Sequence, residues 1–256
     1  MENMIKKEFQ HSLDLTNDEL EIYIPDLLKG LWELGSMPEY VVELFRRNNI
    51  GKGKNVIDLG CGKGAVLVTL TQQFEIKGLG VDIVPHFIEV ANKYAKEFGV
   101  SERVVFKTND IVEIVKTIPK QDIVIYGYDS EVLGDLKQTI IELLKCIKDD
   151  GSIILEFMYS NLPKEGMVME SEMMNILKQT ECHILDRIDW NKETLIQTNR
   201  KNTEIIHENV KNLIFQYPEK QEMFNEYIQN QMIECNEIEN DYTCTTLLLV
   251  KQKNVS

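Results

Sequence analysis

Short apolar runs alternate along much of the chain with stretches in which apolar residues recur every three or four positions. The alternation begins at residue 55, and the apolar runs are 55–59, 77–82, 104–107, 122–128 and 153–156. A short apolar run is typical of a buried strand, and the longer spacing is typical of an amphipathic helix. Strands and helices that alternate in this way favour a parallel sheet covered on both faces. We therefore predict an α/β fold with a doubly wound, mostly parallel sheet.

The two ends of the chain add helices and two more strands to this plan. Residues 1–50 predict short helices, one of them over 25–34, and we expect them to form an N-terminal helical cap. Further strands are predicted at 184–188 and 245–250, and a helical insertion at about 192–240 precedes the last strand. We expect two parts, a cap over 1–50 and a seven-stranded α/β domain over 51–256.

The stretch that joins the first predicted strand to its helix has glycine at every second position. Gly60, Gly62 and Gly64 define this glycine loop (residues 60–64), and Asp58 lies two residues before it. Glycine has no Cβ, so the backbone turns sharply there and a ligand fits directly against it. N–H groups at the helix start would face that ligand. The spacing also satisfies the dinucleotide fingerprint, so a nicotinamide cofactor stays an alternative.

The pattern Asp-x-Gly-x-Gly-x-Gly at 58–64 resembles the first motif of the class I S-adenosylmethionine-dependent methyltransferases, a Rossmann-like superfamily. The resemblance, to members of small-molecule type, implies that the glycine loop with Cys61 packs against the methionine half of S-adenosylmethionine. It places Asp58 near the ammonium of this cofactor. A carboxylate attracts ammonium and sulfonium groups but repels a pyrophosphate. The resemblance also implies that the last strand inserts antiparallel between the fifth and sixth.

Acids also follow the next two predicted strands. Asp82 ends the second strand, 22 residues after Gly60, and Ile83 follows it. In dinucleotide-binding proteins and in the methyltransferases that the chain resembles, an acid at this place accepts hydrogen bonds from ribose hydroxyls. The resemblance further implies that Asp110 meets the adenine amino group and that Ile111 packs on the ring. Each acid has an alternative role as a helix cap, because short acids are preferred there.

Three side chains near the predicted strand ends are candidate catalytic residues. Tyr126 lies near the exit of the fourth predicted strand and Glu156 at the exit of the fifth, and His86 follows the second. Ligands in open α/β sheets bind outside the carboxyl ends of strands, so Tyr126 also counts as a cofactor-binding candidate. Any of the three would orient or deprotonate a substrate nucleophile, and each is equally explained as a polar surface residue. The segment 31–36 is a candidate lid or an ordinary packing segment.

Composition narrows the class of substrate and the compartment. The net charge is −14 and no segment is basic, which argues against a nucleic-acid substrate. No apolar run approaches the ~18 residues of a membrane span. The five cysteines are odd in number, and their spacing favours neither a disulfide framework nor a metal site. We expect a cytoplasmic protein without a metal, a monomer or a homodimer.

These observations predict a methyltransferase that uses S-adenosylmethionine. The acceptor would be an O, N, S or C nucleophile of a small molecule, and residues 126–129 lack the Asn/Asp-Pro-Pro-aromatic motif of family members that act on nucleobase amines or protein amides. Attack on a sulfonium methyl needs mainly proximity and orientation. Three alternatives stay open: a non-catalytic S-adenosylmethionine-binding protein, an NAD(P)-binding oxidoreductase and an RNA methyltransferase.

Overall fold

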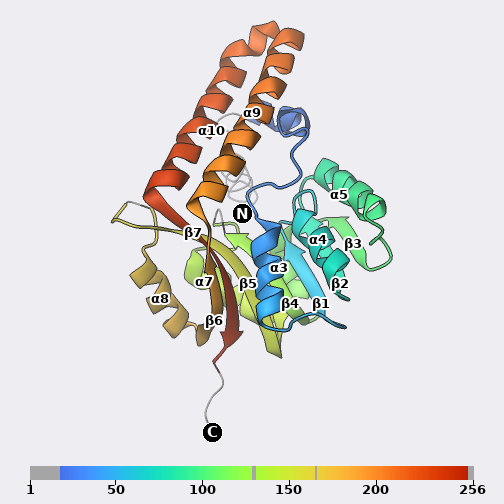
Figure 1. The fold of residues 1–256 in the computed structure, drawn as a ribbon, viewed down its shortest axis with the longest axis vertical. Helices are drawn as coiled ribbons and strands as arrows, with labels where there is room; N and C mark the ends of the chain where they lie inside the picture. Colours follow the sequence, from blue (N-terminus) through green and yellow to red (C-terminus); the bar gives the residue numbers. More distant parts are fainter. Residues whose placement is uncertain (1–17, 129–130, 165, 253–256) are drawn as a thin grey trace. The chain divides into compact units, whose positions relative to one another are not determined.

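The computed structural model describes residues 18–128, 131–164 and 166–252. Contacts divide the chain into two compact units (Figure 1): Met1–Leu31 with Trp190–Thr243, and Trp32–Asp189 with Cys244–Ser256. We call them the helical unit and the sheet unit. The predicted boundary near residue 50 does not separate them, because residues 32–50 belong to the sheet unit. The part of the predicted cap at 1–17 lies outside the described residues.

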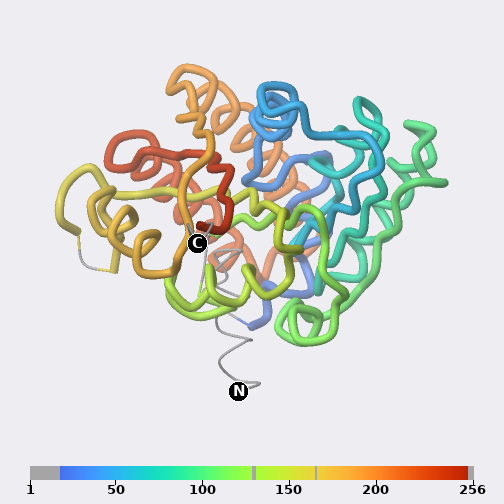
Figure 2. Tube along the Cα trace, turned by 90° about the horizontal axis from the view of Figure 1, so that it is seen from below, coloured from blue at the N-terminus to red at the C-terminus, as the bar shows by residue number. Residues whose placement is uncertain are grey.

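The sheet has seven strands in the order β3-β2-β1-β4-β5-β7-β6. The strands are β1 (Asn55–Leu59), β2 (Lys77–Asp82), β3 (Val104–Thr108), β4 (Gln121–Tyr128), β5 (Ile147–Ser160), β6 (Cys182–Asp189) and β7 (Tyr242–Lys251). The first five form parallel pairs, and β7 runs antiparallel to β6. The predicted doubly wound sheet is therefore confirmed, with its last strand between β5 and β6. In Figure 2 the part of the sheet unit drawn in teal to green and the part drawn in yellow lie on opposite sides of the view.

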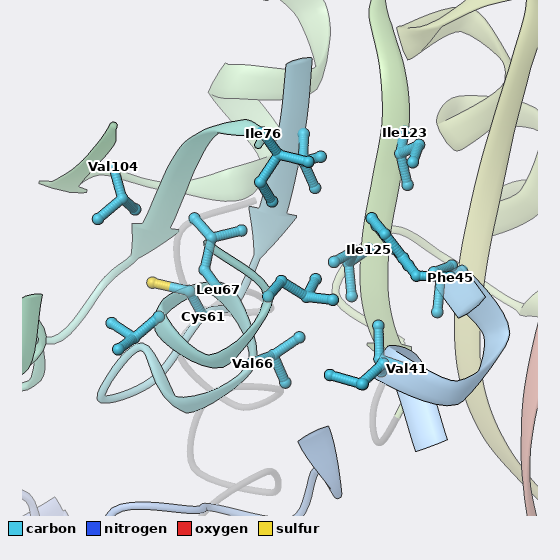
Figure 3. Packing of buried hydrophobic residues seen from close by; sticks show 14 of the residues in the cluster. Val41, Phe45, Cys61, Val66, Leu67, Ile76, Val104, Ile123 and Ile125 are labelled. Carbon is cyan, nitrogen blue, oxygen red and sulfur yellow. The ribbon is translucent and has the colours of Figure 1, made fainter. Parts of the chain in front are cut away.

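Helices cover both faces of this sheet. They are α3 (Pro38–Arg47), α4 (Ala65–Gln73), α5 (Pro85–Glu97), α6 (Ile111–Thr117), α7 (Leu136–Cys146) and α8 (Glu170–Gln179). Alternate residues of each strand face opposite sides. Val56 and Ile125 pack with α3, α4 and α5 in a first core cluster, which Figure 3 shows from close by. Ile57 and Val124 pack with α7 and α8 in a second cluster.

The helical unit contains the predicted insertion as two long helices. Its elements are η1 (Asp18–Tyr23), α2 (Ile24–Leu27), α9 (Lys192–Gln216), η2 (Pro218–Lys220) and α10 (Gln221–Asp241). The side-chain amide of Asn209 on α9 donates to the carbonyls of Leu27 (2.9 Å) and Lys29 (2.8 Å). The predicted helix over 25–34 is wrong, because α2 ends at Leu27 and Gly30 adopts a φ of +85°. That angle is left-handed and does not continue a helix.

Candidate functional site

The glycine loop is a tight turn pinned to β2. The amides of Gly60 and Cys61 both donate to the carbonyl of Val81, at 2.8 and 2.9 Å. Gly60, Gly62 and Gly64 all have positive φ, at 73°, 50° and 77°. These angles favour glycine because a side chain would be strained there. The alternating glycines of the sequence are therefore required by the path of the backbone.

Gly60 and Gly64 face different surroundings. A Cβ on Gly64 would lie 2.7 Å from Phe106 Cζ and 2.9 Å from Ala91 Cβ. A Cβ on Gly60 would have nothing within 4 Å among the described residues. Gly64 is thus closely packed within the sheet unit, whereas no atom of the described residues lies within 4 Å of a Cβ at Gly60. Among the described residues, the backbone at Gly60 is therefore the part of the loop that a ligand could approach.

Asp82 links the end of β2 to the glycine loop. Its Oδ2 accepts a hydrogen bond from the Gly62 amide (2.8 Å), and its Oδ1 accepts one from the Val84 amide (2.9 Å). Val84, not Asp82, is the N-cap residue of α5. Burial raises the pKa of Asp82, and the backbone hydrogen bonds oppose the rise. An ionised carboxylate accepts about four hydrogen bonds, so Asp82 keeps acceptor capacity for a ligand hydroxyl.

Asp58 is buried at the end of β1, beside two other acids. Asp58 is only 5% exposed. The pKa of Asp58 is raised to about 8, mainly by burial and in addition by the charges of Glu156 and Asp82. Asp82 and Glu156 therefore lie close enough to Asp58 for their charges to act on it. Asp58 and Asp82 lie at the carboxyl ends of β1 and β2, whereas Glu156 does not end its strand as predicted, because β5 continues to Ser160. A bound cation would relieve the repulsion that these charges exert on Asp58.

Glu156 is buried on the same face of the sheet as Asp58. Asp58 pairs with Ile125, Ile125 pairs with Ile154, and Glu156 follows two residues later. Its Oε1 accepts a long hydrogen bond from the Met37 amide (3.4 Å). Its Oε2 is buried and has no hydrogen-bond partner among the described residues. Burial raises the pKa of Glu156 to about 7, with the Ser36 hydroxyl and the Met37 amide opposing the rise.

The segment 32–37, most of the candidate lid, contacts both the glycine loop and Glu156. Trp32 Nε1 donates to the Lys63 carbonyl at 3.0 Å. Its ring stacks on Phe98, with centroids 5.1 Å apart and planes 7° apart. At the other end of the segment, Met37 donates to Glu156. The segment therefore bridges the glycine loop and Glu156 within β5, and its role as a lid stays a prediction.

The structure does not bring the three candidate catalytic residues together. Tyr126 is buried in the second core cluster, on the opposite face of the sheet from Glu156. His86 lies in the first turn of α5, where its side chain is 45% exposed and pairs with Glu89 at 3.7 Å. Only Glu156 shares a buried region with Asp58. Catalytic roles for Tyr126 and His86 stay predictions, and neither side chain shares the buried region of Asp58 and Glu156.

The residues predicted to hold adenine lie at the start of α6. Asp110 is the N-cap residue of this helix, and its Oδ1 accepts from the Val112 amide at 2.8 Å. The capping alternative is therefore realised, which leaves the other carboxylate oxygen for a ligand. Ile111 packs partly against the second core cluster, and Ile83 is 42% exposed after Asp82. An adenine contact by these residues stays a prediction.

Two residues near the loop received no role from the sequence. Lys63 is only 4% exposed, and its Nζ lies 5.5 Å from the centroid of the Phe87 ring. Burial lowers the pKa of Lys63 to about 8. Phe106 fills the space beneath Gly64 and Gly80. The signal for Phe106 was present, because glycines opposite a strand aromatic indicate close packing.

The described residues also bear on metals, disulfides and membranes. Within them no group of three His, Cys, Asp or Glu side chains has the arrangement of a metal site. All five cysteines are present as thiols. No helix in the described ranges is long and apolar enough to cross a membrane.

Known proteins share this sequence pattern and fold. A family model described as a methyltransferase domain matches residues 50–235. Norajmaline N-methyltransferase of Rauvolfia serpentina is 26% identical over 148 residues, which are 54% of this chain and 51% of the relative. Demethylmenaquinone methyltransferase of Lactobacillus johnsonii is 25% identical over 134 residues, 51% of this chain and 55% of the relative. The chain thus spans about half the length of these curated relatives.

A solved structure extends the likeness over nearly the whole chain. It is a methyltransferase from Geobacter sulfurreducens, described as dependent on S-adenosylmethionine and solved with S-adenosylhomocysteine. The TM-score is 0.75 at 17% sequence identity, and the alignment covers 90% of this chain and 97% of the other. This likeness shows a shared fold. Because the family model covers most of the sequence, the chain belongs to the methyltransferase-domain family, within the class I S-adenosylmethionine-dependent methyltransferases.

Proposed function

We propose that the protein transfers the methyl group of S-adenosylmethionine to a nucleophile of a small molecule. The observation that carries this proposal is the group of three buried carboxylates, Asp58, Asp82 and Glu156, beside the open backbone at Gly60. Buried carboxylates that repel one another favour a cationic ligand. S-adenosylmethionine carries an ammonium and a sulfonium, so its charge matches this region. The pyrophosphate of a nicotinamide cofactor would add to the repulsion.

The residues present fit the cofactor in three places. The open side of Gly60 leaves room for the methionine half against the backbone. We assign Asp58 to the ammonium. Asp82, anchored by the Gly62 and Val84 amides, is placed to accept hydrogen bonds from the ribose hydroxyls. Asp110 and Ile111 are the proposed adenine contacts.

The chemistry needs few groups from the protein. The bound cofactor supplies a methyl group on a positively charged sulfur. The glycine loop and Asp82 orient it, which is the main catalytic demand of such a transfer. The segment 32–37 contacts the loop through the hydrogen bond from Trp32 to the Lys63 carbonyl, and we assign it the role of excluding water on that side. Glu156 is a buried group able to hold a proton, and its Oε2 has no hydrogen-bond partner among the described residues.

The acceptor and setting are part of the same proposal. The relatives named above act, by their names, on norajmaline and demethylmenaquinone, which supports a small-molecule acceptor. The net charge of −14 opposes binding to nucleic acid. Cysteines kept as thiols support a reducing compartment such as the cytoplasm. We propose a monomer or a homodimer.

Calorimetric titration with three ligands tests the proposal. We expect S-adenosylmethionine and S-adenosylhomocysteine to bind the wild-type protein and NADH not to bind, because only the first two present cations without a pyrophosphate. Binding of NADH in their place would favour the oxidoreductase. Binding of the adenosyl ligands without release of S-adenosylhomocysteine, over a panel of amines, alcohols, thiols and carbon acids, would favour the non-catalytic protein. Salt-dependent retention of labelled RNA would favour an RNA substrate.

A further inference from the structure

We propose that Glu156 selects an amine as the methyl acceptor: its buried Oε2 accepts a hydrogen bond from the protonated amine and then takes its proton. This inference rests on the proposed function and adds the class of substrate. It starts from one atom. Oε2 of Glu156 is buried and lacks a hydrogen-bond partner in the described part of the chain, on a residue 6% exposed. A buried carboxylate oxygen without a donor is costly, so a ligand donor fits there.

The other oxygen of the carboxylate is already held. Oε1 accepts from the Met37 amide at 3.4 Å, and the Ser36 hydroxyl also hydrogen-bonds the carboxylate. Ser36 and Met37 precede α3, which packs in the first core cluster. The carboxylate is therefore held from the α3 side, while Oε2 remains for a ligand. This is the arrangement of a positioned proton acceptor.

Glu156 is separate from the place proposed for the cofactor ammonium. Asp58 ends β1 and Glu156 lies on β5, with β4 between them. Two strand spacings put their backbones on the order of 10 Å apart. Both side chains point to the same face of the sheet. One cation beside Asp58 thus leaves Glu156 for a second one, which would belong to the acceptor.

The charges around Glu156 favour a cation over an anion. Asp58 faces it from β1 and Glu39 from α3, and both are acids. The pKa of the Cys244 thiol on β7 is raised to about 12, mainly by burial and in addition by the charge of Glu156. No base is among these electrostatic partners of Glu156 within the described ranges. A carboxylate or phosphate acceptor would be repelled, whereas a protonated amine would be attracted.

The proton and the bonds balance for an amine. The protonated amine gives one proton to Glu156, which leaves a neutral carboxyl group and a nitrogen lone pair. The nitrogen then forms a bond to the methyl carbon, and the carbon–sulfur bond breaks with its electron pair on sulfur. The positive charge passes from sulfur to the product nitrogen, and the Glu156 proton leaves to solvent. Glu156 titrates in a useful range for this, since its pKa is about 7.

Methylammonium is a suitable probe because it is the smallest alkylammonium ion and should fit wherever a larger protonated amine fits. We expect calorimetry on the protein saturated with S-adenosylhomocysteine to show methylammonium binding, and acetate not to bind. Glu156→Gln should lower the affinity for methylammonium at least about tenfold, as expected for loss of a hydrogen bond to a charged group. The wild-type affinity should rise from pH 6 to pH 8 as Glu156 ionises, and Glu156→Gln should remove this rise.

Glu39→Gln is the matched control, because it removes a nearby acid that is exposed. It should keep methylammonium binding and move the midpoint of the pH dependence to lower pH, since the Glu39 charge raises the pKa of Glu156. The inference is overturned if methylammonium fails to bind with S-adenosylhomocysteine in place. Equal affinity in Glu156→Gln, or a preference for acetate, also overturns it. If S-adenosylhomocysteine itself fails to bind the wild type, the proposed function is what fails.

Discussion

Replacing Gly64 with alanine is expected to lower the free energy of unfolding by about 2–4 kcal/mol, the sum of left-handed strain and overpacking. Gly64 has a φ of +77°, and the new Cβ would lie 2.7 Å from Phe106 Cζ. Phe106 is buried in the first core cluster and has little room to move. Urea denaturation of the ligand-free protein measures the effect.

Gly60→Ala is the matched control for this prediction. Gly60 has a φ of +73°, but its Cβ would meet nothing within 4 Å among the described residues. We expect a loss of only about 1 kcal/mol, from backbone strain alone. S-adenosylhomocysteine binding should instead weaken, because the methyl group enters the space proposed for the ligand. Equal destabilisation by the two substitutions would contradict the packing described around Gly64.

Asp58→Asn is expected to flatten the pH dependence of stability in the ligand-free protein. Burial and neighbouring acids raise the pKa of Asp58 from 3.8 to about 8. Because its pKa is raised on folding, its contribution to stability is complete below about pH 4 and is lost as pH rises through about 8. From pH 6 to 8.5 the wild type should therefore lose about 2 kcal/mol through this group. Urea denaturation at several pH values measures the loss.

The variant should be more stable than the wild type at pH 8.5, and the difference should shrink toward pH 6. An asparagine has nearly the same shape and carries no charge, so the cost of a buried anion disappears. Glu102→Gln serves as control, since Glu102 is an exposed acid of the sheet unit and its removal should leave the pH dependence unchanged. A wild-type stability that rises between pH 6 and 8.5, or a variant with the same slope, would contradict the proposed burial of Asp58.

Much of the sheet and the glycine loop could be predicted from the sequence because the signals are local. The apolar run 55–59, the three glycines and the acid at 82 follow one another closely, and the structure places the carboxylate of Asp82 on the Gly62 amide. The place of Tyr126 could not be predicted in this way, because the sequence does not say which face of β4 each side chain takes. The structure puts Ile125 in the first cluster and Tyr126 in the second.

Other features depend on contacts between distant parts of the chain. In the helical unit the Asn209 side chain donates a hydrogen bond to the Leu27 carbonyl, and no local sequence pattern predicts this hydrogen bond. The burial of Lys63 likewise depends on Phe87 of a later helix. The Glu156 carboxylate is positioned by hydrogen bonds from Ser36 and Met37, which lie more than a hundred residues earlier in the chain. Such pairings arise from the packing of the folded chain.

The central claim is that the glycine loop and Asp82 hold an adenosyl ligand. The most direct measurement is the calorimetric affinity of S-adenosylhomocysteine for the wild type and for Asp82→Asn. An amide side chain accepts through one oxygen only, so it cannot serve the Gly62 and Val84 amides and two ribose hydroxyls together. We expect a loss of affinity of at least about tenfold in Asp82→Asn, with the affinity of the Glu102→Gln control unchanged. An unchanged affinity in Asp82→Asn would contradict the central claim.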